Sequence, residues 1–269
     1  MMNFTVNGHT TYCYTGGKAL DAAKPTAIFI HGVLNDHSVW ILQTRYLANH
    51  GWNVLAVDLP GHCRSAGDPP VTVEAAADFV LALMDAAGLE KTALIGHSFG
   101  SLIAMETAGR AAQRVSHLVL VGTAFPMKVS PALIDASLNA PMKALEMVNI
   151  FSRSTLAPPP SAMGPGTWVY GASMALGRRV LASNTKVNLF HTGFKACDSY
   201  AGGVEAIAKV TCPVLFVLGE VDQMTPPKAA QGLIAKTQHA QVATLPGGHH
   251  QMSETPEPML HALTQFLLP

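Results

Sequence analysis

The sequence predicts an α/β fold in which a mostly parallel central sheet of about eight strands is flanked by helices and carries a helical cap insertion. Short apolar runs rich in β-branched residues alternate with helix-like segments, and the connections between them are short. This alternation favours a parallel sheet with helices on both faces. The runs are apolar at nearly every position, which is typical of strands buried on both sides. A chain of 269 residues, 49% of them hydrophobic, can fill the core of one large domain with an insertion.

The first half of the chain contains most of the predicted strands. An alternating polar and apolar pattern near Gly8 indicates a hairpin, and Gly88 is typical of a residue that ends a helix. In order, the predicted elements are a hairpin of strands 3–6 and 10–14, a strand 27–30, a helix 38–49, a strand 54–59, a helix 73–87, a strand 92–95, a helix 102–112 and a strand 117–121. Ligands of such sheets bind where the strands end, so residues that follow these strands are candidate site residues.

The pattern changes over residues 124–208, where the sequence shows no strand-like run. Four helix-like segments, broken by three consecutive prolines and several glycines, occupy residues 131–139, 142–151, 167–182 and 187–197. We interpret this segment as a helical cap, or lid, inserted into a core of residues 1–123 and 209–269, because it lies between strands whose ends carry candidate catalytic groups. An ordinary helical subdomain that covers apolar surface is the alternative.

The core pattern resumes after the insertion. The predicted elements are a strand 213–218, a helix 227–236, a strand 241–245 and a C-terminal helix 255–266. Pro256 stands at the start of that last helix, where its missing N–H costs nothing. Asp222 follows the first of these two strands and His249 follows the second.

The composition excludes several classes of function. Seventeen basic residues balance seventeen acidic ones, and no basic stripe predicts binding to nucleic acid or to an anionic membrane. No run of 18 apolar residues occurs, so we expect no membrane span. The four cysteines form no C-x-x-C pair and the first residues do not resemble a signal peptide, so we expect a reduced, cytoplasmic protein. The histidines show no H-E-x-x-H spacing, and we expect neither a metal nor an organic cofactor.

A sharp strand-to-helix turn is predicted around Ser98. Residues 96–100 have the sequence G-H-S-F-G and join a predicted strand to a predicted helix. A chain that turns this sharply strains its central residue, and the strain is tolerable only if the residues two positions away are small. Gly96 and Gly100 supply that smallness, so the Ser98 hydroxyl should point outward at the edge of the sheet. The Phe99 N–H then lies at the start of the helix, where it can bind an oxyanion.

A serine hydroxyl at neutral pH needs two further groups to act as a nucleophile. A base must take its proton, and a partner must orient the base and stabilise its charged form. The chain offers a candidate for each role at a strand end, with His249 as the base and Asp222 as its partner for the nucleophile Ser98. The rival acids are Glu220, two residues from Asp222, and Asp198 in the predicted cap.

Five motifs, in this order, resemble those of the α/β-hydrolase superfamily in its esterase and lipase-like branch with a helical cap. They are His31-Gly32-Val33, the segment from Asp58 to Ser65, the turn from Gly96 to Gly100, Gly219-Glu220-Val221-Asp222, and Gly247-Gly248-His249 with Glu254 and Pro256. The order Ser, Asp, His is also that of this family. The resemblance covers nearly the whole chain outside the predicted cap. Cys63 departs from it, because the family usually has glycine there, which puts the conformation of that loop in doubt.

The resemblance implies roles for individual residues. The oxyanion hole would be formed by the backbone N–H groups of Val33 and Phe99. In the family, a glutamate follows the catalytic histidine by five residues. Because Glu254 follows His249 by five residues, this spacing assigns the base to His249 and leaves His250 as its neighbour on the loop.

Together, these features predict a serine hydrolase that cleaves a carboxylic ester, or a related acyl compound, of a small and fairly apolar molecule through an acyl-enzyme intermediate. His31, Trp168 and Met224 are weaker candidates for substrate contacts, and His31 could equally be a structural histidine that orders its loop. C–C bond hydrolases, thioesterases and lactonases use the same groups and stay open as alternatives. From another class, a ligand-binding, receptor-like protein on the same scaffold is also open. The predicted partner is a small-molecule substrate, and the oligomeric state is left open.

The charge of the substrate is not determined by the sequence. The low charge of the cap segment favours an uncharged, apolar group. An anionic substrate would need an arginine at the site, and the sequence does not place any of its candidates there. Those candidates are Arg64, Arg153, Arg178 and Arg179.

Overall fold

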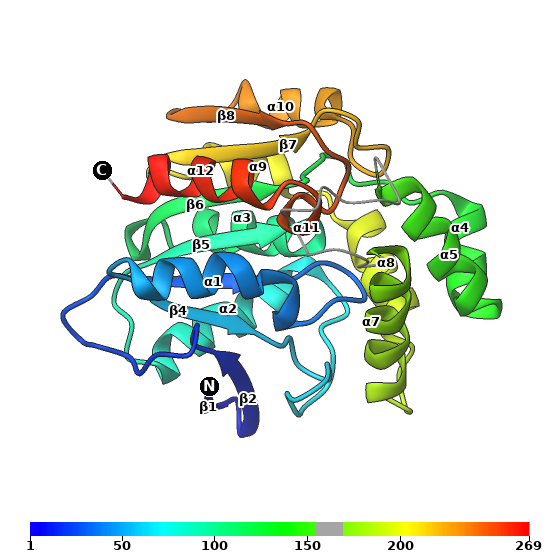
Figure 1. The fold of residues 1–269 in the computed structure, drawn as a ribbon, viewed down its shortest axis with the longest axis horizontal. Coiled ribbons are helices and arrows are strands. Elements are labelled where there is room, and N and C mark those ends of the chain that lie inside the picture. The colour runs from blue at the N-terminus through cyan, green and yellow to red at the C-terminus, as the bar shows by residue number, and fades with distance from the viewer. Residues whose placement is uncertain (154–168, 269) are drawn as a thin grey trace.

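The computed structural model describes residues 1–153 and 169–268 of the chain. Eight strands form one sheet in the spatial order β1-β2-β4-β3-β5-β6-β7-β8 (Figure 1). Their bounds are β1 (Met2–Val6), β2 (His9–Tyr14), β3 (Thr26–Ile30), β4 (Asn53–Val57), β5 (Thr92–His97), β6 (Val115–Val121), β7 (Val214–Gly219) and β8 (Ala240–Leu245). β2 runs antiparallel to β1 and β4, and all other neighbouring pairs are parallel. The predicted sheet of about eight mostly parallel strands is therefore confirmed.

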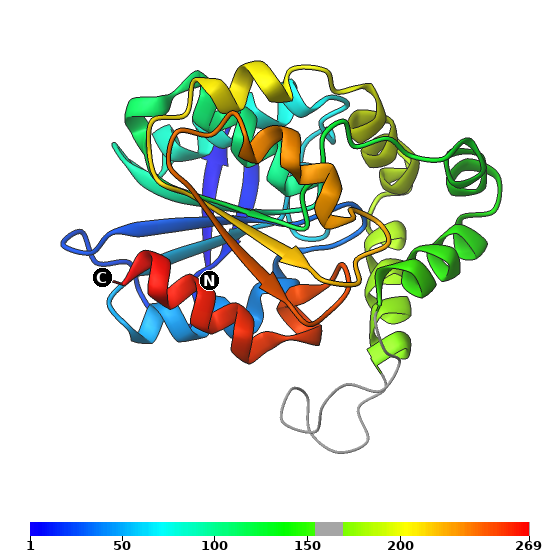
Figure 2. The same cartoon turned by 90° about the horizontal axis from the view of Figure 1, so that it is seen from above.

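Helices cover both faces of this sheet (Figure 2). The helices on one face are α1 (Ile41–Asn49) and α12 (Pro256–Leu267), and those on the other are α2 (Val73–Ala86), α3 (Phe99–Arg110) and α9 (Gly203–Ala208). Side chains of β3 alternate between the two layers, with Ile28 and Ile30 packed toward α2 and α3 and Phe29 packed toward α1 and α12. All of β3 is buried, which explains why its sequence is a continuous apolar run.

Several element ends differ from the predicted ones. β5 extends two residues beyond the predicted strand, to His97, and β4 ends at Val57, so that Asp58 lies just beyond it. The predicted helix 38–49 begins with the 3-10 turn η1 (His37–Trp40), because the Asp36 side chain accepts a hydrogen bond from the Ser38 N–H and caps that turn. The predicted helix 227–236 consists of the 3-10 turn η3 (Pro227–Ala230) and the short α10 (Gln231–Ile234). Two short helices, α9 and α11 (Gln251–Glu254), were not predicted.

Four helices of the predicted cap gather at one end of the sheet, the end toward which the arrowheads of β5 and β7 point (Figure 1). They are α4 (Pro131–Asn139), α5 (Pro141–Ser152), α7 (Val169–Ser183) and α8 (Leu189–Ser199). Their apolar side chains form a cluster of their own, which also includes Leu34 of the core. α9, at the end of the predicted cap segment, packs instead against α3 of the core. These four helices thus lie where ligands bind in open α/β sheets.

All four cysteines are free thiols, and three of them are buried. The exception is Cys63, which is partly buried and has a φ of 46°, in the left-handed region that glycine adopts most easily. The loop therefore keeps a glycine-like backbone at the position where the family usually has glycine. Burial raises the pKa of the Cys63 thiol to about 12, so the group stays protonated at neutral pH and is a poor nucleophile.

Within residues 1–153 and 169–268, not one helix is long and apolar enough to cross a bilayer.

Candidate active site

A cavity of about 490 Å³ lies between the ends of the core strands and the cap helices. Ser98 and His249 both line it, on the side of the core. Most of the wall that the cap contributes is apolar, and this part includes Leu145, Val148, Leu176, Phe190 and Phe194. The cavity is thus lined by two predicted catalytic residues that lie 151 positions apart in the sequence.

Ser98 has the strained backbone that the sequence predicts for a sharp turn. It lies between β5 and α3 with φ 53° and ψ −118°, a region that non-glycine residues rarely adopt. A Cβ atom added at Gly96 would collide with the carbonyl oxygen of Gly100, and one added at Gly100 would collide with the carbonyl oxygen of Ile30. The two glycines are therefore required because backbone segments meet at these positions, and this packing holds Ser98 in its strained conformation.

The loop after β8 places His249 beside the loop after β7. The Nδ1 atom of His249 lies 2.8 Å from Oδ2 of Asp222 and 3.0 Å from Oγ1 of Thr225. Thr225 donates to Oδ2 of Asp222, and the backbone N–H groups of Met224 and Thr225 donate to Oδ1. Since an ionised carboxylate only accepts hydrogen bonds, Nδ1 of His249 carries the hydrogen and Nε2 is left as the acceptor.

Asp222 is buried, yet its surroundings favour the ionised form. Burial by itself would raise the pKa of Asp222, but the attraction of His249 and the hydrogen bonds from His249 and Thr225 outweigh burial and hold the pKa below its ordinary value. The rival acids lie elsewhere, because Glu220 is exposed and Asp198 accepts a hydrogen bond from the Val129 N–H. Asp222 is the carboxylate in contact with His249.

Two contacts that the sequence does not reveal hold the backbone of His249. Its N–H donates to the carbonyl oxygen of Ser152, at the end of α5, over 2.7 Å. Its carbonyl oxygen accepts a hydrogen bond of 2.8 Å from Nε2 of His97, the residue before Ser98. The histidine loop is therefore tied to the cap on one side and to the turn around Ser98 on the other. His97 belongs to the G-H-S-F-G motif of residues 96–100, but its contact with a backbone carbonyl has no signature in the sequence.

The loop that carries Val33 packs directly against Ser98. A Cβ atom added at Gly32 would lie 3.2 Å from Cβ of Ser98, and Val33 itself lines the cavity. On the other side of Ser98, Phe99 is the first residue of α3. The two predicted oxyanion donors thus belong to backbone segments that flank the serine.

The three weaker candidates for substrate contacts have different positions. Met224 lines the cavity. His31 is fully buried and is not among the described residues that line the cavity. Its Nδ1 lies 2.8 Å from the carbonyl oxygen of Gly32, and its Nε2 accepts a hydrogen bond from the Leu59 N–H. These contacts connect two loops, and they favour the alternative in which His31 is a structural histidine that orders its loop. Trp168 lies outside the described residues.

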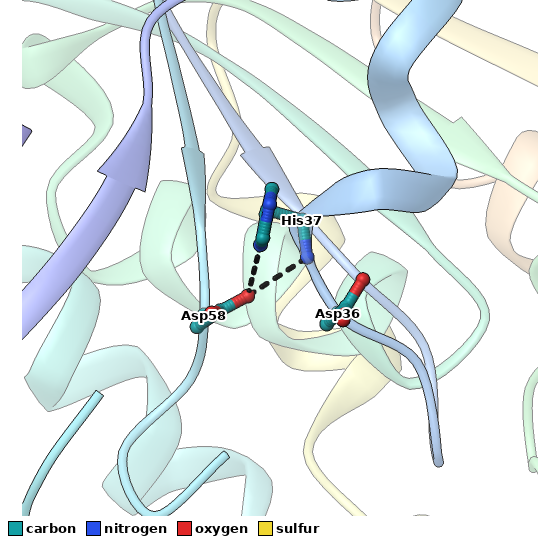
Figure 3. Close-up of side chains that lie close together, drawn as sticks. All are labelled: Asp36, His37 and Asp58. Atoms are coloured by element: carbon teal, nitrogen blue, oxygen red, sulfur yellow. Dashed lines mark hydrogen bonds and ion pairs between the residues drawn. The ribbon is translucent and has the colours of Figure 1, made fainter. Parts of the chain in front are cut away.

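A second cluster of titratable side chains, Asp36, His37 and Asp58, follows β3 and β4 (Figure 3). Their potential ligand atoms lie within 4.8 Å of one another, as in some metal sites. The carboxylate oxygens are, however, already engaged by donors of the chain. Asp58 accepts from the backbone N–H and the ring of His37, and Asp36 accepts from Ser38 and forms an ion pair of 2.6 Å with Arg179. We interpret the cluster as a junction between the core loops and α7.

Several buried histidines of the core are held neutral. Burial, together with the neighbouring His249, lowers the pKa of His97 to about 3. Burial and the nearby His31 lower the pKa of His62 to about 4. Their protonation would place a positive charge in a low-dielectric interior, so both rings stay neutral at physiological pH.

Comparisons with known proteins place this geometry in a family context. Residues 25–256 match the family model described as alpha/beta hydrolase fold. The chain is 25% identical to RutD of Agrobacterium fabrum, a proposed carbamate hydrolase, over 100% of this chain and 98% of the relative. Among solved structures it is similar to an enol-lactonase from Burkholderia xenovorans LB400 (TM-score 0.83, 21% identity, 100% of both chains). It is also similar to an esterase from Exiguobacterium antarcticum (TM-score 0.82, 17% identity, 98% of both chains).

We expect Gly100→Ala to lower the free energy of unfolding by about 3 kcal/mol or more, because the added methyl group meets the Ile30 carbonyl and a backbone must move. Urea denaturation followed by circular dichroism measures this change. Gly232→Ala is the control, since a Cβ atom at Gly232 meets nothing within 4 Å, and it should be neutral or slightly stabilising. Equal stability of both variants would contradict the close packing at the turn.

Stability should decrease as the pH falls from 7 to 5. An unfolded histidine takes up a proton near pH 6.5, whereas folded His62 and His97 stay neutral down to about 4 and about 3. Their contribution to the free energy of unfolding is therefore fully present above about pH 6.5. It decreases as the pH falls toward the folded pKa values, by on the order of 1 kcal/mol per pH unit for each histidine. Urea denaturation at pH 7, 6 and 5 measures this slope. His62→Gln should reduce the slope, and an unchanged slope in this variant would contradict the assignment.

Proposed function

The chain belongs to the alpha/beta hydrolase fold family, and from its site we propose that it is a serine hydrolase that cleaves a carboxylic ester or a related acyl compound. The observation that carries this proposal is the buried Asp222–His249 pair, which opens on the same cavity as the strained Ser98. A base with an oriented tautomer and a partly exposed serine on the same cavity are the groups that nucleophilic acyl transfer needs.

In the first step, the Ser98 Oγ atom attacks the substrate carbonyl carbon while Nε2 of His249 takes the hydroxyl proton. The Asp222 carboxylate stabilises the imidazolium that forms. The negative charge on the carbonyl oxygen would be bound by the backbone N–H groups of Val33 and Phe99. When the C–O bond to the alcohol breaks, His249 gives its proton to the departing oxygen and the acyl group stays on Ser98.

The second step repeats this sequence with water. His249 removes a proton from a water molecule, and the resulting oxygen attacks the acyl carbon. The bond to Ser98 then breaks, and His249 returns the proton to the serine oxygen. The products are a carboxylic acid and the alcohol released in the first step, and the enzyme is regenerated.

The cavity supports a small substrate with an apolar part. Its volume of about 490 Å³ lies within the usual range for small-molecule sites. The apolar side chains of α5, α7 and α8 could cover an alkyl or aryl group of the substrate. The similar proteins are named a carbamate hydrolase, an enol-lactonase and an esterase, so a carbamate and a lactone belong beside esters in a substrate panel.

A fluorophosphonate probe should label the wild-type protein at Ser98 and should not label Ser98→Ala. On an active aryl ester, we expect Ser98→Ala and His249→Ala each to lower kcat/KM by 10³-fold or more, because each removes a step of proton transfer or attack. The control is His261→Ala, at an exposed position of α12, which should keep wild-type activity. Full activity of His249→Ala would refute the assigned base.

The same experiment separates the alternatives. Labelling of Ser98 without turnover on esters, lactones or carbamates would favour a ligand-binding protein on this scaffold. Faster turnover of a dienone-type substrate than of any ester would favour a C–C bond hydrolase. The absence of labelling would refute the proposed nucleophile.

A further inference from the structure

Arg153 carries a buried positive charge at the wall of the cavity. It follows α5 directly, is 8% exposed, and lines the same cavity as Ser98 and His249. A guanidinium in such a position costs free energy unless its charge is balanced and its N–H groups are bonded. The hydrogen bonds and ion pairs of Arg153 therefore show how far the cavity wall itself stabilises this charge.

The hydrogen-bond partners of Arg153 within the chain are neutral. Its Nη1 donates to Oγ of Ser253 over 3.4 Å and its Nη2 donates to Oγ of Ser173, and both serines also line the cavity. Its Nε, also buried, has no hydrogen-bond partner within residues 1–153 and 169–268. In the same part of the chain, no carboxylate forms an ion pair with Arg153. Two hydroxyls thus orient the guanidinium without neutralising it.

The electrostatic surroundings of Arg153 are only partly compensated. Burial lowers the pKa of Arg153 to about 10, and the carboxylate of Glu254 offsets part of that effect. The group is therefore still charged at neutral pH. Its charge also acts on His250, which lines the cavity and whose pKa is lowered by burial and by Arg153. Arg153 thus places a positive charge at this part of the cavity wall.

The second arginine at the cavity differs from Arg153. Arg179 pairs with Asp36 over 2.6 Å and is largely exposed, so that its charge is already balanced. Arg153 is instead fixed next to the reaction centre, because the preceding residue, Ser152, accepts the hydrogen bond from the His249 N–H. The partly compensated charge of Arg153 thus lies on the segment that contacts the histidine loop.

We propose that Arg153 is the anion-binding residue of this site and that the substrate is an ester, or related acyl compound, which carries a carboxylate. This proposal rests on the hydrolase function proposed above. A carboxylate can accept two N–H bonds from one guanidinium, and Nε supplies a donor that has no partner within residues 1–153 and 169–268. The apolar wall around it would cover the part of the substrate between the carboxylate and the scissile bond. This refines the expectation of a fairly apolar molecule, in that one end of the molecule is charged.

Two pairs of matched esters test the proposal. The rate of hydrolysis of each ester is measured by titration of the acid that is released. In the first pair, monomethyl adipate carries a carboxylate on its acyl side and methyl hexanoate is the neutral ester of the same length. In the second pair, 5-acetoxypentanoate carries a carboxylate on its alcohol side and pentyl acetate is the neutral ester. We expect the wild-type enzyme to prefer the anionic member of one pair, which identifies the side. Arg153→Met should lower kcat/KM for that anionic ester by 10- to 100-fold and leave the neutral ester within about threefold, since it removes a charge-assisted hydrogen bond. Arg153→Lys should restore part of the preference.

Arg178→Met is the matched control. Arg178 is the neighbour of Arg179 on α7, is exposed, and lies outside the described cavity lining, so this variant should keep the wild-type preference. Thermal unfolding of each variant verifies that it is folded. An equal loss on anionic and neutral esters in Arg153→Met would mean that Arg153 acts only on the structure of the site. That result, or a wild-type enzyme without preference for either anionic ester, would overturn the proposal.

A binding measurement separates this proposal from the proposed function. Calorimetric titration of the Ser98→Ala variant with the same esters reports binding without turnover. Tighter binding of an anionic ester that is lost in Ser98→Ala/Arg153→Met would support the anion site even if the wild-type protein hydrolysed no ester. Turnover of esters with equal binding of both members of each pair would support the hydrolase and refute the anion site.

Discussion

The backbone of Gly100 lies against the carbonyl group of Ile30, and the rest of the site depends on this close approach. It allows β5 to end and α3 to begin on either side of one residue, so that Ser98 takes a positive φ and faces the cavity. Ile30 is also the last residue of β3, and the chain leads from there into the loop that carries Val33. One backbone contact therefore places the serine and the loop with a predicted oxyanion donor beside each other.

The two buried charges of the site have different surroundings. Asp222 accepts hydrogen bonds from His249, from the Thr225 hydroxyl and from two backbone N–H groups, so that its negative charge is stabilised by donors of the chain itself. Arg153 is oriented by hydroxyl groups and has no ion pair with a described carboxylate. The hydrogen bonds of Asp222 are therefore complete without a ligand, whereas an anionic ligand could still form a favourable interaction with Arg153. In a low-dielectric space, such a charge favours a ligand group of the opposite sign.

Much of the fold could be predicted from the sequence, because strands buried on both faces are continuous apolar runs and because each predicted catalytic residue follows such a run. The pairing of Asp222 with His249 followed from the chain order and the family spacing. The remaining contacts of the site could not be predicted. The carbonyl groups of Ser152 and His249 are acceptors that every residue type provides, so their partners leave no signature in the sequence. The burial of Arg153 likewise depends on how α5 and α7 pack, and the sequence shows only that an arginine is present.

The hydrogen bond between Ser152 and His249 also limits how this protein can diverge. Here the last residue of α5 holds the backbone of His249, the proposed general base, so an insertion, deletion or transplanted segment that shifts this helix end would also shift the imidazole. A productive chimera would have to keep α5 up to its final turn and recombine elsewhere, and new specificities would arise more readily by point substitution of the wall than by replacement of the whole cap.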